Sequence, residues 1–491
     1  MRDRLDQRFR LLVGSRRGLS RHQTLRHAVQ WSYDHLDDAE KPLLERCSVF
    51  AGGFDLESAC AVMGSEDDFA VLDLLDALVR KSLLVADRSS GRTRFSMLET
   101  IRQFAEEQLV ASGVADEARA AHSRYFAGRE AAVLALWDSP RQREAYTWFT
   151  AELANLRTAF RWAADQGDLD VAATIGTYAG FLGYLIENYE PIAWAEELIE
   201  PARAVDHPRL AFLYVMASQC YTTGRMEDAV RYSEAGQMAA RSGRGEVPLG
   251  LQALLMAAYP AIGQPERAVE WCRAELASTR HPHALTRTGL VIGLKMAGFD
   301  GEAMAAATGL IDAAEATHNP WTLSYALLAY SIAFRDADPD HVREALRRGL
   351  IVTQASGNRG NESHIAGALA RIEAKHGDPL AALEYITLGI RNYHDSGNTT
   401  HMRAPLAVLA TLFDRLGHHE SAATLAGFAL NALTVMTSPD INTAIAHLRD
   451  VLGEATYESL ARKGETMTTA EMVAYAYDQI DQARTELEHP S

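Results

Sequence analysis

The sequence predicts a mainly α-helical protein with two parts: a small N-terminal domain of helices and one hairpin, then a long array of two-helix repeats. A glycine followed five residues later by alanine recurs along the second half of the chain. Helical spacing of apolar residues gives way to short β-like runs between residues 82 and 98. With 491 residues, 47% hydrophobic and 23% charged, the chain has the composition of an ordinary folded protein and room for two or more domains.

The glycine-to-alanine motif sets the period of the array. Successive motifs lie 35 to 42 residues apart when a degenerate unit at Asp340 and Ala345 is counted. An apolar helix precedes each glycine and a second helix follows it, so glycine eases the turn and alanine lets the two helices approach. This period predicts a superhelical array. The full motifs pair Gly224 with Ala229, Gly263 with Ala268, Gly298 with Ala303, Gly377 with Ala382 and Gly417 with Ala422.

The N-terminal part has the element order of a winged helix. We expect helices over residues 23–36 and 39–50, the second capped by Asp37 or Asp38. Gly52-Gly53 ends that helix and Asp55 caps the next, and a further helix covers residues 69–80. Strands at 82–87 and 93–98 then form a hairpin around a glycine-bearing loop, and a helix runs from 99 to 113.

Every later segment has a helical pattern. A helix over 141–167 places large apolar residues on one face, and Gly167 with Ala172 repeats the motif spacing, so the array begins before Gly224. We divide the chain into a connector (1–22), a winged-helix domain (23–113), a helical linker with the first repeat-like helices (114–200), an α-solenoid (201–435) and C-terminal capping helices (436–491), with Thr468 or Thr469 as a cap.

The charge and the cysteine content of the chain indicate which partners it can bind and in which compartment it is found. The net charge of −17 opposes binding to a phosphate backbone, whereas the first 30 residues carry eight arginines against two aspartates. The four cysteines form no C-x-x-C pair, which suits a reducing compartment. No apolar run is long enough to span a bilayer, and we expect a cytoplasmic protein without a membrane partner.

The repeat region resembles tetratricopeptide repeats, in which a turn glycine and a small residue five positions later form the recognisable core. The intervals here exceed the family's usual period, so its peptide-binding positions are not carried over. The resemblance implies an α-solenoid that binds a protein or peptide. For the aromatic residues of the array we expect core packing, and a binding role on the concave face stays open for some of them: Tyr221, Tyr259, Trp271, Trp321, Tyr325 and Phe413.

Three strings in residues 8–109 carry a second resemblance: "RFRLLVGSRRGLSRHQTLRHAVQWSYDHL", "LLERCSVFAGGFDLESA" and "LLDALVRKSLLVAD…TRFSMLETIRQFAEEQL". They resemble the segment between the ATPase core and the repeats in actinobacterial STAND regulators of the NB-ARC type. This resemblance implies signal transduction and transcription regulation. No G-x-x-x-x-G-K-[ST] motif occurs, so we expect the chain to begin after the ATPase core of such a regulator.

The same resemblance points to two candidate sites. The family's phosphate-sensing Met-His-Asp corresponds here to Met97, Leu98 and Glu99; Leu98 cannot donate a hydrogen bond to phosphate, and a helix-capping role is the main alternative for Glu99. The arginine cluster is interpreted as a contact surface for a separately encoded ATPase domain, a solvated face or a DNA contact. Its candidate interface residues are Arg8, Arg16, Arg17, Arg21 and His22.

We predict no catalysis and no metal site. The close histidine pairs, His281 with His283 and His418 with His419, lack ligand partners at suitable spacing, and no nucleophile motif occurs. No cofactor is expected in this chain, and ATP or ADP only if an ATPase domain is supplied elsewhere. The predicted function is that of a non-enzymatic regulatory protein whose solenoid binds a protein or peptide. The alternatives are DNA binding by the winged helix, which the acidic helix over 69–80 disfavours, and half of an ATPase completed in trans.

Overall fold

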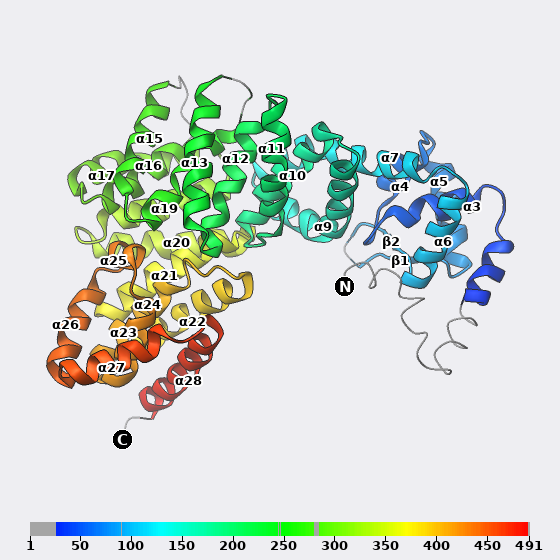
Figure 1. The fold of residues 1–491 in the computed structure, drawn as a ribbon. Coiled ribbons are helices and arrows are strands. Elements are labelled where there is room, and N and C mark those ends of the chain that lie inside the picture. The colour runs from blue at the N-terminus through cyan, green and yellow to red at the C-terminus, as the bar shows by residue number, and fades with distance from the viewer. Residues whose placement is uncertain (1–25, 90, 244, 246, 279–283, 490–491) are drawn as a thin grey trace. The chain divides into compact units, whose positions relative to one another are not determined.

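The structure is a computed structural model that describes residues 26–489 apart from 90, 244, 246 and 279–283 (Figure 1). The predicted connector and the interface candidates Arg8, Arg16, Arg17, Arg21 and His22 lie outside these residues. The chain forms two compact units. Unit 1 contains the residues up to 131 together with 148–175, and unit 2 contains 132–147 and the residues from 176 onward. The division falls within the segment 114–200, whose helices belong to both units.

Unit 1 has a helical stretch over 26–34, three helices, a hairpin and further helices. The mainly helical class with an N-terminal hairpin agrees with the prediction. Its elements are α3 (Glu40–Arg46), the 3₁₀ helix η2 (Cys47–Val49), α4 (Leu56–Met63), α5 (Asp68–Arg80), β1 (Val85–Asp87), β2 (Arg94–Ser96), α6 (Glu99–Ala111) and α7 (Ala115–Gly128), and the helices that continue into unit 2 are α8 (Glu130–Trp137), α9 (Gln142–Asp165) and α10 (Leu169–Leu185).

The hairpin is short, and its second strand, β2, is paired along both of its edges. β1 and β2 are antiparallel, with Ala86 opposite Phe95. Phe54, between η2 and α4, adds a bridge to Phe95, and each of the two backbone N–H groups donates to the other residue's carbonyl oxygen. The rings of Phe50 and Phe54 stack with centroids 4.7 Å apart. Buried phenylalanines therefore join the hairpin to the helices of the winged helix.

Local capping explains where two of these helices begin. Asp55 accepts a hydrogen bond from the Ser58 backbone N–H, and the Ser58 hydroxyl accepts one from Asp55, which forms a capping box and confirms the predicted cap of α4. The predicted cap of α3 was wrong. Ala39 occupies the cap position, and the Asp37 backbone N–H instead donates to Glu40. The Glu40 side chain in the first turn thus reaches back to the Asp37 backbone, and no described side chain caps the first N–H groups of α3.

A polar network ties the hairpin to α9 within unit 1. The guanidinium of Arg94 donates to Glu152 at 2.5 Å and to the carbonyl oxygen of Gly53 at 2.7 Å. Asn155 accepts from the Gly52 backbone N–H and donates to the Gly53 carbonyl oxygen. Gly52 and Gly53, predicted to end a helix, thus also provide the backbone groups that hold α9 in place.

Unit 2 is an array of paired helices. Its first elements are α11 (Glu190–Ala204), α12 (Leu210–Ala217), η3 (Ser218–Thr223), α13 (Met226–Arg241), η4 (Pro248–Met256), α14 (Ala258–Ala261), α15 (Pro265–Ser278), α16 (Ala284–Met296), α17 (Asp300–Ala307), α18 (Leu310–Glu315) and α19 (Pro320–Phe334). The later elements are α20 (Pro339–Ser356), α21 (Arg359–His376), α22 (Pro379–Ser396), α23 (Arg403–Leu416), α24 (His419–Ala429), α25 (Ala432–Thr437), α26 (Asp440–Leu452), α27 (Glu454–Glu465) and α28 (Thr469–Glu488).

The repeat motif lies where the sequence places it, at the turn between paired helices. Its alanines Ala229, Ala268, Ala303, Ala382 and Ala422 are completely buried. Four of its glycines adopt the left-handed backbone that glycine tolerates best, for example Gly224 with φ +88°, whereas Gly377 is extended with φ −115°. Each small alanine therefore sits in a helix contact, as the spacing predicts.

One predicted repeat helix does not form as an α-helix. Residues 248–256 fold as the 3₁₀ element η4, which is kinked where Leu249 and Gly250 take positive φ values, +58° and +69°. The apolar pattern of this segment is preserved, and Leu251 and Leu255 are fully buried. In this segment the spacing of apolar residues predicts which side chains are buried but not the conformation of the backbone.

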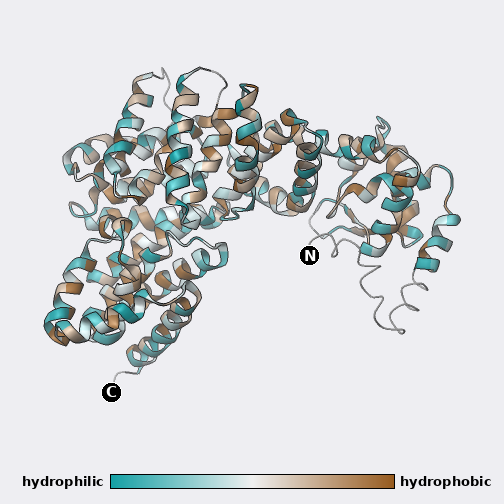
Figure 2. Ribbon diagram, in the orientation of Figure 1, coloured by the Kyte–Doolittle hydropathy of each residue, from teal (hydrophilic) through white to brown (hydrophobic). Residues whose placement is uncertain are grey.

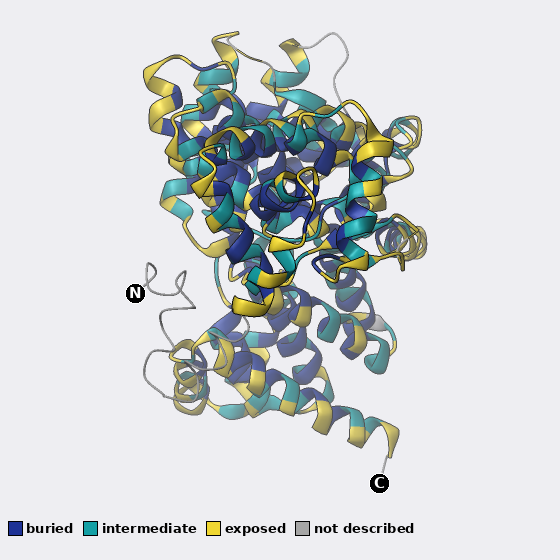
Figure 3. Cartoon of the chain, turned by 90° about the vertical axis from the view of Figure 1, so that its right-hand side faces the viewer, coloured by how far each residue is buried: buried dark blue, intermediate teal, exposed yellow. Residues whose placement is uncertain are grey.

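The C-terminal helices pack on the last repeats. α24 and α27 cross so closely that a Cβ on Gly427 would lie 2.1 Å from the Ala461 carbonyl oxygen. The predicted cap at Thr468 is confirmed, with a capping box to Glu471. Hydrophobic faces turn inward and exposed residues cover the outside (Figures 2 and 3). Among the described residues no helix has both the length and the hydropathy needed to cross a membrane.

Candidate functional site

The most developed candidate site is a cavity inside unit 2, with a volume of about 240 Å³. The array forms it by returning on itself. The Thr400 hydroxyl donates to the Tyr221 carbonyl oxygen, and the Asn398 side chain donates to the Tyr189 hydroxyl at 2.9 Å. α14 and α25 also pack together. Early and late repeats therefore enclose one space between them.

Aromatic side chains line much of this cavity. They come from the end of α10, the start of α11, η3, α19, α21, α22 and the loop before α23. Several contact one another: the Tyr393 hydroxyl and His364 Nδ1 lie 3.0 Å apart, and the Trp321 and Tyr325 rings stack at 5.2 Å. The aromatic wall consists of Tyr184, Tyr189, Tyr221, Trp321, Tyr325, His364, Tyr393 and His401.

The structure divides the six predicted aromatic positions of the array into two groups. Tyr221, Trp321 and Tyr325 border the cavity, as the concave-face alternative allowed. The other three are 1% exposed and pack in the interior, as expected for core residues: Tyr259, Trp271 and Phe413.

Glu187 is the most unusual residue at the cavity. It connects α10 to α11 with φ +61°, a left-handed conformation rarely adopted by residues other than glycine. Its side chain is 2% exposed, and one carboxyl oxygen has no hydrogen-bond partner among the described residues. Burial raises the pKa of Glu187 to about 8, although Arg359 lies 3.6 Å away and opposes this shift. The side chain is therefore protonated near neutral pH and can donate a hydrogen bond.

The remaining titratable groups of the aromatic wall are neutral near pH 7. Burial lowers the pKa of His364 to about 4 and that of His401 further below its ordinary value, where repulsion from His364 adds to the effect. Burial also raises the pKa values of Tyr184 and Tyr393 well above their ordinary value. This end of the cavity thus offers polar but uncharged groups.

Three cations line the cavity elsewhere: Lys295, Arg335 and Arg371. Lys295 pairs with Asp300 at 3.0 Å, and Arg335 lies 3.4 Å from Asp336. Arg371 makes no hydrogen bond or ion pair with any residue that the structure describes. Burial, with repulsion from Arg335, lowers the pKa of Arg371 to about 10.

Sequence reasoning did not single out Glu187, His364, Arg371 or His401. A weak signal was present at Glu187, an acidic residue after the apolar helix end "GFLGYLI" with tyrosines three positions before it and two after it. No motif connects the others, because the cavity brings together segments that are far apart in the chain.

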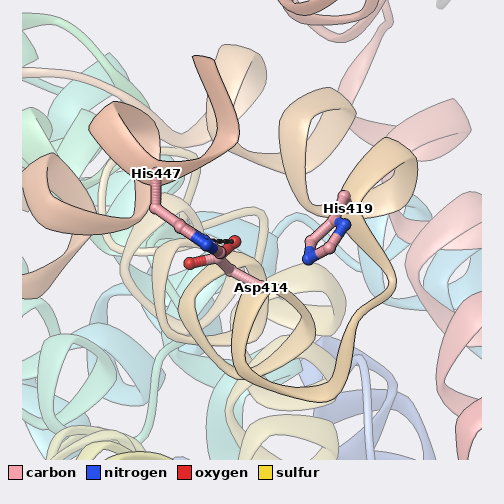
Figure 4. Close-up of side chains that lie close together, drawn as sticks. All are labelled: Asp414, His419 and His447. Carbon is pink, nitrogen blue, oxygen red and sulfur yellow. Dashed lines mark hydrogen bonds and ion pairs between the residues drawn. The ribbon is translucent and has the colours of Figure 1, made fainter. Parts of the chain in front are cut away.

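A second cluster contains three possible metal ligands, Asp414, His419 and His447, whose ligand atoms lie within 4.8 Å of one another. They come from α23, α24 and α26, and Figure 4 shows Asp414 joined to His447 with His419 beside them. Two imidazoles and a carboxylate suit zinc. However, His447 Nδ1 already lies 2.8 Å from Asp414, and half of the His447 side chain is exposed. We assign no metal here. His281 and His283 lie outside the described residues.

The degenerate nucleotide-sensing positions belong to a helix start. Leu98 is the N-cap of α6 and is 61% exposed, and the Glu99 carboxylate accepts from Arg102 and Gln103. Glu99 is the first residue of α6, and no described side chain caps this helix, so these contacts are side-chain pairs along the helix surface and the helix-capping alternative does not form. α5, the third helix of the winged helix, carries Asp68, Asp73 and Asp76 against Arg80, so its charge opposes approach to DNA.

Comparison with known proteins supports the N-terminal assignment. Residues 36–110 match the family model described as a winged helix-turn-helix domain. The chain is 40% identical over 205 residues to proteins of Mycobacterium tuberculosis and Mycobacterium bovis named "Putative HTH-type transcriptional regulator", a match covering 41% of this chain and 23% of the relative. It is also 40% identical over 125 residues to an uncharacterized M. tuberculosis protein, covering 25% of this chain and 32% of that one.

The chain spans about a quarter of the length of the regulators that it matches. Among solved structures, a STAND protein with a tetratricopeptide repeat sensor from Pyrococcus horikoshii is similar with a TM-score of 0.47 and 14% identity, covering 88% of this chain and 66% of that one. The family match and the order of three helices and a hairpin agree. The chain therefore contains a winged helix-turn-helix domain over residues 36–110, followed by an array of paired helices.

Proposed function

We propose that this chain is a non-catalytic regulatory protein whose unit 2 senses a ligand bound in its central cavity. The observation that carries the proposal is Glu187, a buried carboxyl group on strained backbone that lines an aromatic cavity and has an oxygen without a hydrogen-bond partner among the described residues. Unusual backbone and unsatisfied buried groups are expensive in a fold and concentrate at functional sites.

The chemistry of the cavity favours binding over catalysis. None of the described residues that line it is a cysteine. Its histidines and tyrosines are held neutral by burial, and Glu187 keeps its proton near neutral pH. Such groups orient a ligand by hydrogen bonds and ring contacts, and none of them is an activated nucleophile.

The cavity also refines the expected partner. A solenoid that binds a protein usually presents an open concave groove, whereas here contacts such as Thr400 to Tyr221 close the array. A small molecule or a short chain end suits this space better than a folded protein surface. The relatives' name supports a link to transcription, and in our proposal ligand binding in unit 2 biases that output. DNA contact through α5 remains a weaker alternative because of its three aspartates.

Gly367 provides a direct test, because it lines the cavity and a Cβ at this position would meet no atom within 4 Å. We would titrate the full chain with the fluorescent apolar probe N-phenylnaphthylamine. Gly367→Phe should fill the cavity and weaken probe binding at least tenfold, while Gly367→Ala, the matched control, should bind as the wild type does. Absence of wild-type binding, or equal binding by both variants, would count against a ligand cavity.

A further inference from the structure

The cavity is positively charged inside a chain whose net charge is −17. Its ionisable lining consists of three cations and one acid, Glu187, apart from its histidines and tyrosines. Because Glu187 is protonated near neutral pH, the three cations are not balanced from within the lining. Aspartates outside the lining pair with two of the three cations, so the unbalanced charge at the cavity is that of Arg371, and such a charge attracts an anion.

Two of the three cations have structural explanations. Lys295 lies in the last turn of α16 and Arg335 caps α19, positions at which a cation offsets the helix dipole. Both also have aspartate partners, Asp300 and Asp336. Arg371 has neither explanation, since it lies inside α21, five residues before the helix ends at His376.

Arg371 is therefore a guanidinium placed beside a like charge, with no hydrogen-bond or ion-pair partner among the described residues. Arg335 repels it, and Asp336 and Asp440 attract it only from a distance beyond ion-pair contact. Arg371 is half-buried and lines the cavity, so its guanidinium is within reach of a ligand bound there. A guanidinium offers a planar fork of donors that fits a carboxylate or phosphate.

The two ends of the cavity differ in their lining. Along α19 its lining residues recur at spacings of four and three, beginning with Trp321 and Tyr325 and ending with Arg335. Along α21 the lining passes from His364 to Arg371, seven residues and roughly 10 Å further on. The first parts of both helices meet, because Asn361 donates to the Trp321 carbonyl oxygen. Aromatic side chains thus lie at one end and cations at the other.

We propose that the cavity binds a small organic anion with a flat apolar body, whose acidic group pairs with Arg371 beside Arg335 and Lys295. Its rings lie against Trp321 and Tyr325. This inference rests on the proposed sensing function and specifies its ligand class as an aromatic acid. The separation of about two helical turns between His364 and Arg371 suits a body of two or three fused or linked rings.

The test compares two fluorescent probes that differ by one anionic sulfonate group: anilinonaphthalenesulfonate and the neutral N-phenylnaphthylamine. Wild-type protein should bind both. Arg371→Met should weaken the anionic probe at least tenfold and leave the neutral probe within twofold, because only the first loses a charge-assisted hydrogen bond. Arg347→Met is the matched control, an exposed arginine on α20, none of whose described residues lines the cavity, and should change neither affinity.

The outcomes distinguish a failure of the anion assignment from a failure of the proposed sensing function. If neither probe binds the wild type, the sensing function itself fails. If both bind but Arg371→Met affects them equally or not at all, the cavity stands and the anion assignment is overturned. Thermal unfolding checks that the variant is folded.

A wild-type competition keeps the inference testable should Arg371→Met unfold. Naphthoate should displace the neutral probe at least ten times more effectively than naphthalenemethanol, which has the same rings without the charge. Equal displacement would overturn the anion assignment. A short peptide ending in phenylalanine carries the same aromatic carboxylate on a chain end, and tighter binding of this peptide than of naphthoate would overturn the assignment to a small molecule.

Discussion

Replacement of Glu187 by glutamine should make the protein more stable by an amount that grows with pH. In the folded protein the pKa of Glu187 is about 8, against an ordinary 4.5. Below pH 4.5 the acid is protonated in both states and costs nothing. Above this pH the unfolded chain releases a proton that the folded chain retains, so the stability of the wild type falls until the pH passes 8.

The size of the effect follows from the width of that pH window. At about 1.4 kcal/mol per pKa unit, the penalty reaches about 5 kcal/mol above pH 8 and about 3 kcal/mol at pH 7. Glutamine keeps the shape of the side chain and cannot ionise. The charged groups that face Glu187 are Arg359 and Glu362, with Tyr184, Tyr189 and Tyr393 nearby, and none of them is altered by the substitution.

The assay is urea unfolding of the wild type and Glu187→Gln at pH 5.5, 7.0 and 8.5, followed by tryptophan fluorescence. Glu384→Gln, an exposed carboxylate on α22, serves as the control and should differ from the wild type by the same small amount at every pH. A constant difference for Glu187→Gln would refute the raised pKa. A variant that becomes less stable than the wild type as pH rises would show that an ionised Glu187 paired with Arg359 stabilises the fold.

Three further substitutions test other parts of the account by thermal and urea unfolding. Arg371→Met should raise the stability by about 1 to 3 kcal/mol, because it removes an unpaired cation whose pKa is lowered to about 10; a loss would indicate a structural role for this arginine. Gly427→Ala should destabilise by about 3 kcal/mol, since its Cβ would lie 2.1 Å from a backbone oxygen, whereas Gly367→Ala should gain up to about 1 kcal/mol; similar effects would contradict the close helix crossing. Asp55→Ala should cost about 1 kcal/mol by removing the cap of α4, and no loss would mean that the capping box is not formed in solution.

The features that can be predicted well from the sequence are those that depend on residues close together along the chain. Asp55 and Thr468 cap their helices because each bonds to a residue three positions on, and the motif alanines are buried because their spacing places them in a helix contact. Asp37 shows the limit of this logic, since its backbone N–H donates to Glu40 and no described side chain caps α3. At η4 the apolar pattern was correct, but the backbone is kinked at Leu249 and Gly250 and continues as a 3₁₀ helix.

The candidate site could not be predicted because its residues converge only through closure of the array. Tyr221 and Thr400 meet across 179 positions of sequence. Glu187 acquires its raised pKa from burial and its strain from the connection between two helices, neither of which a residue type reveals. Arg371 resembles any other helical arginine until the structure shows that it has no partner.

The most direct measurement of the central claim is a crystal structure of the full chain in the presence of naphthoate. Our account predicts the naphthalene rings between Trp321 and Tyr325 and the rest of the aromatic wall, with the carboxylate within hydrogen-bond distance of Arg371. An empty cavity at a naphthoate concentration that saturates binding in solution, or naphthoate bound only elsewhere on the protein, would contradict it.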